Sequence, residues 1–488
     1  MGVIRRQSIK NTIISFAAAL IGAVNMLLIY EILLEPEQLG KIKYLTATAF
    51  LLVPFVMLGI STTMLRFFPR FENRDKKHHG ILGFGLLYTL TGYILYLLVS
   101  LICYDLLPGK FQDNYMVITG ILFFAVIMTL LGSYLASLKS IVIPSIFNNL
   151  WIKIGVPLLV VLYYYNIISF DELEWNLIAV YAIATIGLFI YIKFMGQLFL
   201  RPNLKFLTPE LKSDIKSYAI YSTLGPMGAV LMTQLDQFMV TEIMEYSDNG
   251  IYVMAVYFGS LFNIPMMSVF SIANPIISDS SDKGDTDNIR KIYEKSSINL
   301  LVIGLMGLML IWLNIDDVFS LMSKGEIYAQ GKYVILYLSV AKVIDMATSV
   351  NGAIIAHSKY FRFNLYAILL LGLLNILSNY FFINSMGING AAIATLSALA
   401  IFNLVKFFYV IKRFDMQPFT WNSLKAVIIF AVVFTGGMYF DFALDGLMLT
   451  ILVKIIVLSG IFGLLVYVFK VSEDINGVIH SILNRIKI

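Results

Sequence analysis

The feature that most constrains this chain is a series of about fourteen apolar runs, most of them longer than 20 residues, between residues 11 and 470. A helix of about 20 apolar residues spans the hydrocarbon core of a bilayer. Charged residues make up only 13% of the 488 residues, whereas soluble proteins carry about 25%. We therefore predict an all-α polytopic membrane protein with about 14 transmembrane helices, starting with a first span that is retained because it is too long for a signal peptide.

The positive charges alternate along the predicted loops. If the N-terminus is cytoplasmic, 27 of the 35 Lys and Arg lie in inner loops, tails or inner span ends, and five lie outside. The other three, Lys153, Lys342 and Lys454, lie within spans. Because cytoplasmic loops are enriched in Lys and Arg, this pattern predicts that both termini are cytoplasmic.

The sequence gives no sign of an enzyme. No predicted outer loop exceeds about 17 residues, too few for a catalytic domain. There is no Gly-rich phosphate-binding loop, and the one cysteine and four histidines show no metal-ligand spacing. We therefore expect no catalytic residues, no cofactor, no metal site and no nucleic-acid partner.

A weak internal repeat divides the chain. LGKIKY (39–44) and NGIYVM (249–254) each follow a short acidic turn, at an offset of about 210 residues. The longest inner linker is charged, contains two prolines and separates the sixth span from the seventh. We predict a six-helix lobe at 1–200, a cytoplasmic linker at 201–217, a second six-helix lobe at 218–413, and two peripheral helices with a tail at 414–488. Repeated halves that meet at a central site are a common transporter plan.

The tenth predicted span carries two ionisable residues, Lys342 and Asp345, on one helical face. An ionisable group at mid-bilayer costs about 2.5–3.5 kcal/mol on insertion scales, so it usually faces a partner or a wet cavity. One interpretation is a polar stripe in which Lys342 binds substrate and Asp345 binds a coupling ion. The alternative is that the two side chains only neutralise each other.

Other polar residues within spans are further candidates. Asp236 is the one acid deep in the seventh span, and the repeat offset places Asn25 at the equivalent position of the first span. Asp236 could bind H⁺ or Na⁺, or it could anchor an interhelical hydrogen bond. Lys153 and Arg66 could face a cavity, although Lys153 could also snorkel to the inner interface and Arg66 could serve as a positive-inside anchor. Lys454, near the outer end of a peripheral span, is expected to snorkel.

Three segments resemble the polysaccharide transporters of the multidrug/oligosaccharidyl-lipid/polysaccharide exporter superfamily, which include the O-antigen flippases. LEPEQLGKIKYL (34–45) is similar to the turn after the first span of that family. Residues 235–279 resemble its seventh and eighth spans, and residues 375–413, with GINGAAIAT, resemble its eleventh and twelfth. The positions that match are Asp236, Gly250, Tyr252, Gly387, Gly390 and Thr395, most of which would serve helix packing.

The resemblance implies two six-helix lobes around a central cavity, with two C-terminal helices outside. It also implies a flippase of the bacterial inner membrane that moves polyprenyl-diphosphate-linked oligosaccharide outward for surface polysaccharide (O-antigen, lipopolysaccharide) biosynthesis by alternating access. Its partners would be membrane lipids, H⁺ or Na⁺ as coupling ion, and a glycan polymerase with other assembly proteins. The alternatives are a cation-coupled multidrug exporter of the same superfamily and a membrane-embedded glycan polymerase or ligase.

Overall fold

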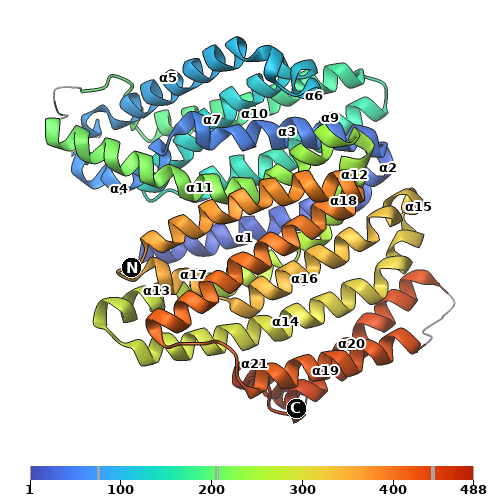
Figure 1. The fold of residues 1–488 in the computed structure, drawn as a ribbon. Coiled ribbons are helices and arrows are strands. Elements are labelled where there is room, and N and C mark those ends of the chain that lie inside the picture. The colour runs from blue at the N-terminus through green and yellow to red at the C-terminus, as the bar shows by residue number, and fades with distance from the viewer. Residues whose placement is uncertain (1, 74–76, 204–205, 207, 441–445, 487–488) are drawn as a thin grey trace. The chain divides into compact units, whose positions relative to one another are not determined.

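The computed structural model describes residues 2–73, 77–203, 206, 208–440 and 446–486, and all its regular elements in these ranges are helices (Figure 1). The chain divides into two compact units, Met1–Gly250 and Ile251–Ile488. The predicted boundary between lobes at residues 201–217 stays a prediction, and positions 204, 205 and 207 of that linker lie outside the described residues.

The first unit contains the following elements, together with the start of α12: α1 (Gly2–Val24), η1 (Asn25–Tyr30), α2 (Glu31–Leu33), α3 (Pro36–Met57), α4 (Ile60–Phe71), η2 (His78–Gly80), α5 (Ile81–Ile102), η3 (Tyr104–Leu106), α6 (Gly109–Asp113), α7 (Tyr115–Ser137), α8 (Val142–Ser145), η4 (Ile146–Trp151), α9 (Ile152–Tyr164), α10 (Phe170–Phe194) and α11 (Pro209–Ile243). The second unit continues with α12 (Tyr246–Ser260), α13 (Asn263–Lys283), α14 (Thr286–Leu321), α15 (Gly325–Tyr328), η6 (Ala329–Gly331), α16 (Lys332–Thr348), α17 (Asn351–Ala356), α18 (Arg362–Phe414), α19 (Trp421–Tyr439), α20 (Leu447–Val468) and α21 (Glu473–Ile486).

The described residues contain ten helices that are long and apolar enough to cross a membrane, or eleven if the bent pair α12–α13 is one span. This confirms a multi-pass helical membrane protein, while the count of fourteen stays a prediction. Two features of the helices explain part of the difference between the ten or eleven candidate spans and the fourteen predicted spans. The α18 helix runs through two predicted spans, with a break at Gly387 (φ 59°). The α16 helix is only 17 residues long because the tenth predicted span breaks at Ser349.

The two turns of the predicted repeat have the same local structure. The backbone N–H of Glu35 donates to the side chain of Gln38 (3.0 Å), and the backbone N–H of Glu245 donates to the side chain of Asp248 (3.1 Å). Both bonds join residues three apart at a helix start, where the free backbone N–H groups need acceptors. Each residue of one pair lies 210 positions from its counterpart, so the repeat offset holds at the level of single hydrogen bonds.

The same two turns pack on each other through glycines. A Cβ added at Gly40 would lie 1.7 Å from the carbonyl oxygen of Tyr246, and one added at Gly250 would lie 1.9 Å from that of Pro36. Gly250 lies 210 residues after Gly40, and Tyr246 lies 210 residues after Pro36, so each contact is the repeat counterpart of the other. The starts of helices α3 and α12 are therefore related by a local two-fold axis. Asn249 adds a hydrogen bond to the carbonyl of Gly40 (2.9 Å).

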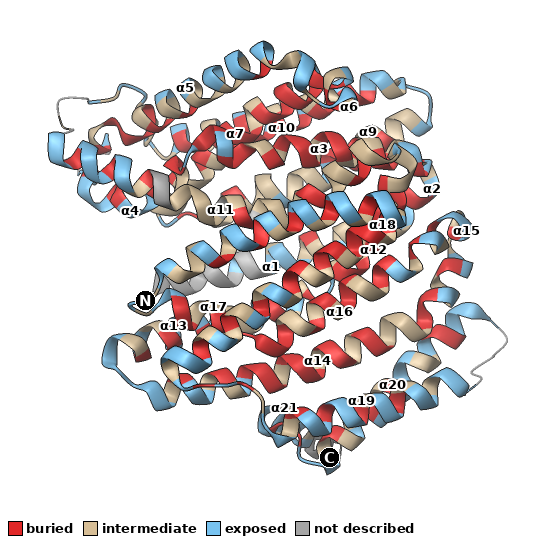
Figure 2. Cartoon of the chain, in the orientation of Figure 1, coloured by how far each residue is buried: buried red, intermediate tan, exposed pale blue. Residues whose placement is uncertain are grey.

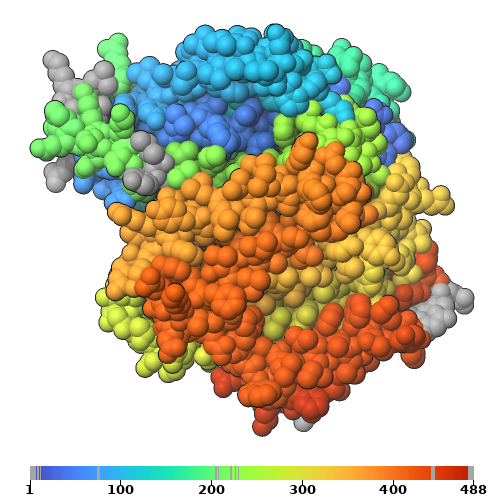
Figure 3. Space-filling view, in the orientation of Figure 1, coloured from blue at the N-terminus to red at the C-terminus, as the bar shows by residue number. Residues whose placement is uncertain are grey.

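The second unit is organised around α14. Its apolar side chains, with those of α16, α19 and α20, form a core that includes Leu301, Met309, Met346, Ile429 and Phe462. Figure 2 shows mostly buried residues along α14 and many exposed residues along α19 and α20. In Figure 3 the side chains of α19 and α20 form a continuous part of the viewed surface of this unit. Exposed apolar side chains such as Leu452 and Ile456 suit a lipid-facing position.

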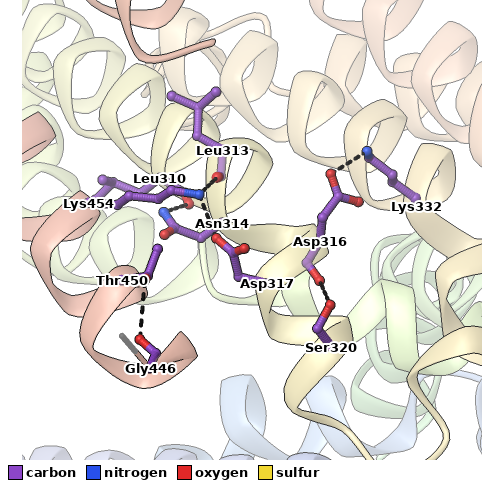
Figure 4. Close-up of polar contacts among 10 residues, drawn as sticks. All are labelled: Leu310, Leu313, Asn314, Asp316, Asp317, Ser320, Lys332, Gly446, Thr450 and Lys454. Atoms are coloured by element: carbon purple, nitrogen blue, oxygen red, sulfur yellow. Dashed lines mark hydrogen bonds and ion pairs between the residues drawn. The ribbon is translucent and has the colours of Figure 1, made fainter. Parts of the chain in front are cut away.

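A polar cluster joins α20 to the C-terminal segment of α14 (Figure 4). Lys454 forms an ion pair with Asp317 (2.6 Å), and the two side chains are only 18% and 21% exposed. The sequence predicted that Lys454 snorkels to the interface, whereas the structure shows it in an ion pair. Its ammonium group is neutralised by a carboxylate that the sequence places 137 residues away.

Candidate functional site

The first unit holds a polar contact between the first and fifth predicted spans, built around a proline. Pro157 in α9 has no N–H, so the carbonyl of Lys153, four residues earlier, loses its helical donor. The side-chain amide of Asn25 donates to that carbonyl instead (2.7 Å). Asn25 begins the π-helical segment η1, and the second π-helical segment, η4, ends just before Lys153. Such π-segments occur frequently at functional sites.

The side chain of Lys153 turns toward the first span. Its Nζ donates to the carbonyl oxygen of Ala18 (2.9 Å). Gly22 makes room for this approach, since a Cβ there would lie only 3.1 Å from Nζ. Lys153 and Asn25, two of the predicted site residues, are thus brought together by reciprocal contacts between α9 and the α1–η1 helix.

A second lysine, Lys43 of α3, belongs to the same region. It interacts electrostatically with Lys153, and its Nζ lies 5.3 Å from the ring centroid of the buried Tyr30. By its position, Lys43 is one of the five lysines predicted on the outer side, close to the start of the second predicted span. Its proximity to Lys153 depends on the packing of α3, which no local signal reveals.

The other two predicted residues of the first unit lie elsewhere. Arg66 is exposed on α4 and stacks on the ring of Tyr218 (4.2 Å from the guanidinium carbon to the ring centroid). Asp236 is buried within α11, at 7% exposure. A substrate role for Arg66 and an ion-coupling role for Asp236 stay proposals.

In the second unit, Lys342 and Asp345 have different hydrogen-bonding partners. Lys342 donates to the side-chain oxygen of Asn263 at the start of α13 (3.0 Å). Asp345 accepts from the amide of Asn403 in α18 (3.1 Å), and the same Asn403 accepts from the hydroxyl of Thr348 (2.9 Å). Among the described residues, the structure shows no ion pair between Lys342 and Asp345, so mutual neutralisation does not describe their contacts here.

Lys406 of α18 is the functional candidate that sequence reasoning missed. It is 7% exposed, its Nζ lies 4.1 Å from the ring centroid of Phe402, and it interacts electrostatically with Asp345. By its position it is one of the 27 Lys and Arg predicted in inner loops, tails or inner span ends, where a lysine needs no further explanation. Lys406 lies three residues after Asn403, and residues three apart share one side of a helix. This spacing was the one sign in the sequence that Lys406 lies near Asn403.

A cavity of about 320 Å³ lies beside Asp345 and Lys406. It borders the break between α16 and α17, where Ser349 has φ 46° and ψ −122°, outside the regions that non-glycine residues usually adopt. Irregular backbone at membrane depth is tolerated where it is buried in protein or lines a water-filled cavity. The break therefore suits a partly open cavity of the second unit that has polar side chains in its wall.

The described lysines differ in whether they have a carboxylate partner. Several are paired with carboxylates: Lys41 with Glu174, Lys110 with Glu245, Lys283 with Asp279, Lys295 with Glu473, Lys332 with Asp316, and Lys454 with Asp317. Four others, Lys43, Lys153, Lys342 and Lys406, have no carboxylate within ion-pairing distance in the part of the chain that the structure describes. An unpaired ammonium group inside a span is expensive and marks a functional position by default.

No cluster of three His, Cys, Asp or Glu side chains that could hold a metal ion occurs among the described residues. The arrangement offers positive charge, hydrogen-bonding amides and a polar cavity. Such a set binds and orients ligands.

Comparison with known proteins identifies the fold. Residues 222–381 match the MatE family model. The structure is similar to lipid II flippase MurJ in an inward closed conformation (TM-score 0.72, 14% identity, 94% of this chain and 98% of that chain covered). It is also similar to a multidrug resistance MATE family transporter of the MOP superfamily in its inward-facing conformation (0.64, 12%, 82% and 94%) and to one in an outward-facing conformation (0.54, 14%, 85% and 95%).

No curated protein matches the sequence. The structural relatives are described as a flippase and as transporters, not as enzymes. With these matches over more than four-fifths of its length, the chain has the same all-helical fold as these solved transporters, and its residues 222–381 match the MatE family model.

Proposed function

We propose that this protein is a flippase of the bacterial inner membrane. It moves polyprenyl-diphosphate-linked oligosaccharide from the cytoplasmic to the periplasmic leaflet for surface polysaccharide synthesis, with both termini in the cytoplasm. The observation that carries the proposal is the set of four unpaired lysines within the spans. A diphosphate group is anionic, and charge-assisted hydrogen bonds from lysine to phosphate are among the stronger polar contacts in proteins. The match to a lipid flippase over 94% of the chain supports the same substrate class.

The diphosphate site is proposed at Lys153 and Lys43. Asn25 and the carbonyl of Ala18 hold Lys153 in place, so its ammonium group is oriented before the substrate arrives. Exposed Arg66 is proposed to meet the anionic head group at the cytoplasmic entrance, and Lys342 is proposed to attract it within the second unit. The apolar lipid tail stays in the bilayer.

The outer ends of α3 and α12 are proposed to form the closed outer gate. Around the paired glycines, Lys110 donates to the carbonyls of Thr241 (2.8 Å) and Met244 and pairs with Glu245 (3.3 Å). These contacts must separate if the substrate leaves toward the periplasm. Alternating access then consists of breaking this outer contact while an inner one forms.

Two energy sources are proposed. An inside-negative membrane potential favours outward movement of an anion by about 2.3 kcal/mol per charge per 100 mV. Asp236 is proposed to carry H⁺ or Na⁺ in exchange, or Asp345 is proposed to carry H⁺.

Ion coupling has a direct test in vesicles with an imposed pH or Na⁺ gradient. We expect the gradient to accelerate translocation by the parent protein, and Asp345→Asn or Asp236→Asn to remove that acceleration while leaving slow potential-driven movement. Equal acceleration in the parent and both variants would rule out coupling through either carboxylate.

A cation-coupled multidrug exporter is the second candidate, and the fold matches to MATE transporters favour it. Such a carrier needs acidic sites, whereas the four unpaired lysines would repel its substrates. The third possibility, a glycan polymerase or ligase, has no supporting observation in the structure.

Deletion of the gene separates the first two candidates. We expect complete lipid-linked units to accumulate on the cytoplasmic leaflet, surface polysaccharide to disappear, and resistance to cationic drugs to stay unchanged. A strain with normal surface polysaccharide and increased drug sensitivity would contradict the flippase function and support drug export.

A further inference from the structure

The cavity of the second unit combines hydrogen-bond donors with acceptors, and one lysine with one carboxylate. Lys406 offers only hydrogen-bond donors, and Asp345 offers only acceptors. Ser349 and Asn274 can both donate and accept, and Phe270 adds an apolar face. The cavity is lined by Phe270, Asn274, Asp345, Ser349, Val350, Asn351, Gly352, Ala353, Ala356, His357 and Lys406.

One buried side chain at this cavity lacks partners. Asn351, the first residue of α17, is 0% exposed, and neither its amide nitrogen nor its amide oxygen has a hydrogen-bonding partner among the described residues. Buried polar side-chain atoms rarely lack partners, and leaving such a group unsatisfied costs about 1–3 kcal/mol. Asn351 lies two residues after the strained Ser349. A small change at this break would turn the amide toward a ligand in the cavity.

The charges decide which ligand class fits. A bare anion would be opposed by Asp345, and a cation would be opposed by Lys406. A hydroxyl group donates one hydrogen bond and accepts others, so it can satisfy a carboxylate, an ammonium group and an amide together. The volume of about 320 Å³ is near the lower end of ligand pockets, about 300–1,000 Å³, and suits one sugar ring better than a complete lipid-linked unit.

We propose that this cavity is a saccharide subsite, in which Asp345, Lys406 and Asn351 bind the hydroxyl groups of a neutral sugar of the transported unit. This subsite rests on the proposed flippase function, because a drug exporter has no need of a saccharide subsite. The subsite discriminates among glycans by their hydroxyl pattern, whereas the lysines of the first unit bind the diphosphate that all such substrates share.

Protection of an introduced cysteine tests the subsite. The purified full-length protein carries Cys103→Ser, which removes its one cysteine, and Ala353→Cys at the cavity wall. The rate of maleimide labelling is measured with a panel of neutral sugars (galactose, rhamnose and N-acetylglucosamine), with inorganic pyrophosphate, and with Na⁺ against K⁺. We expect at least one neutral sugar to slow labelling in a saturable manner and the ions to leave it unchanged.

Three variants in this background locate the effect. Asn351→Leu removes two hydrogen-bonding groups and should weaken protection about tenfold. Gly352→Ala adds a methyl group at ordinary contact distance, 3.6 Å from the Nζ of Lys406, and favours helix. It narrows the cavity without preventing folding, so it should also weaken protection. The matched control is Asn314→Leu, which alters a buried asparagine of α14 whose amide oxygen also lacks a partner, and it should change nothing.

Each outcome decides between specific alternatives. Protection by pyrophosphate alone would make the cavity an anion site, and protection by Na⁺ alone would make it a cation site, so either result overturns the proposal. No protection by any sugar also overturns it, even if lipid-linked oligosaccharide is transported. Conversely, sugar protection in a protein that transports no lipid-linked unit would keep the subsite and reject the proposed function.

Discussion

Replacing Lys153 with methionine is expected to slow translocation of lipid-linked oligosaccharide about tenfold to a hundredfold. A hydrogen bond to a charged group contributes about 1.5–3 kcal/mol, and each 1.4 kcal/mol is a factor of ten. Methionine keeps most of the packing but removes the ammonium group that the substrate diphosphate would contact. The measurement is the initial rate of translocation in proteoliposomes that contain equal amounts of folded protein.

Two further variants separate substrate binding from a structural role. Lys153→Arg keeps the positive charge and should retain a larger part of the activity than Lys153→Met. The double variant Lys454→Ala with Asp317→Ala removes a lysine from a span together with its partner, so it leaves no unpaired charge and should transport normally. If Lys153→Met transports at the parental rate, or if the arginine and methionine variants are equally inactive and equally unstable, Lys153 does not bind the diphosphate.

Replacing Gly250 with alanine is expected to disrupt the contact between the helix starts of α3 and α12. The new Cβ would lie 1.9 Å from the carbonyl oxygen of Pro36, and backbone cannot move aside as a side chain can. Overpacking typically costs about 1–3 kcal/mol, and a clash between two backbones belongs at or above the upper end. Gly40→Ala should behave in the same way, because its Cβ would meet the carbonyl of Tyr246 at 1.7 Å.

The readouts are thermal unfolding in detergent and the labelling of a cysteine introduced at Gln38. Loss of stability or increased labelling from outside fits a closed gate at this position. The control is Gly460→Ala in α20, where a Cβ would meet nothing within 4 Å and alanine favours helix. A Gly250→Ala protein that is as stable as the control, and in which the cysteine at position 38 is labelled no faster than in the parent, would show that this glycine contact is not tight.

The helices and the repeat could be predicted from the sequence because local constraints decide them. In a bilayer the backbone must satisfy its own hydrogen bonds, so apolar runs of 20 residues have little alternative to helix. The repeated turns carried their own capping residues, Gln38 and Asp248, and the paired glycines followed the same offset. The breaks were harder to predict, because Ser349 is neither Gly nor Pro, the residues that usually mark one.

The site was only partly predictable because its contacts join distant segments. The spacing of Lys342 and Asp345 correctly placed both on one helix, but packing gave them Asn263 and Asn403 as partners. Lys43 and Lys406 were assigned to interfaces because they lie near span ends, and only the packing of their helices brings them near Lys153 and Asp345. Pro157 was a usable signal, since a proline within a span leaves a carbonyl without its helical donor.

The most direct test of the central claim is translocation by the purified protein in proteoliposomes. A fluorescent polyprenyl-diphosphate-linked oligosaccharide is placed in both leaflets, and a membrane-impermeant reagent measures the fraction that reaches the outer one. The flippase account predicts rapid exchange between leaflets, slowed by Lys153→Met, and no transport of cationic drugs. Vesicles in which the lipid-linked oligosaccharide stays in its original leaflet, while a cationic drug crosses, would contradict it.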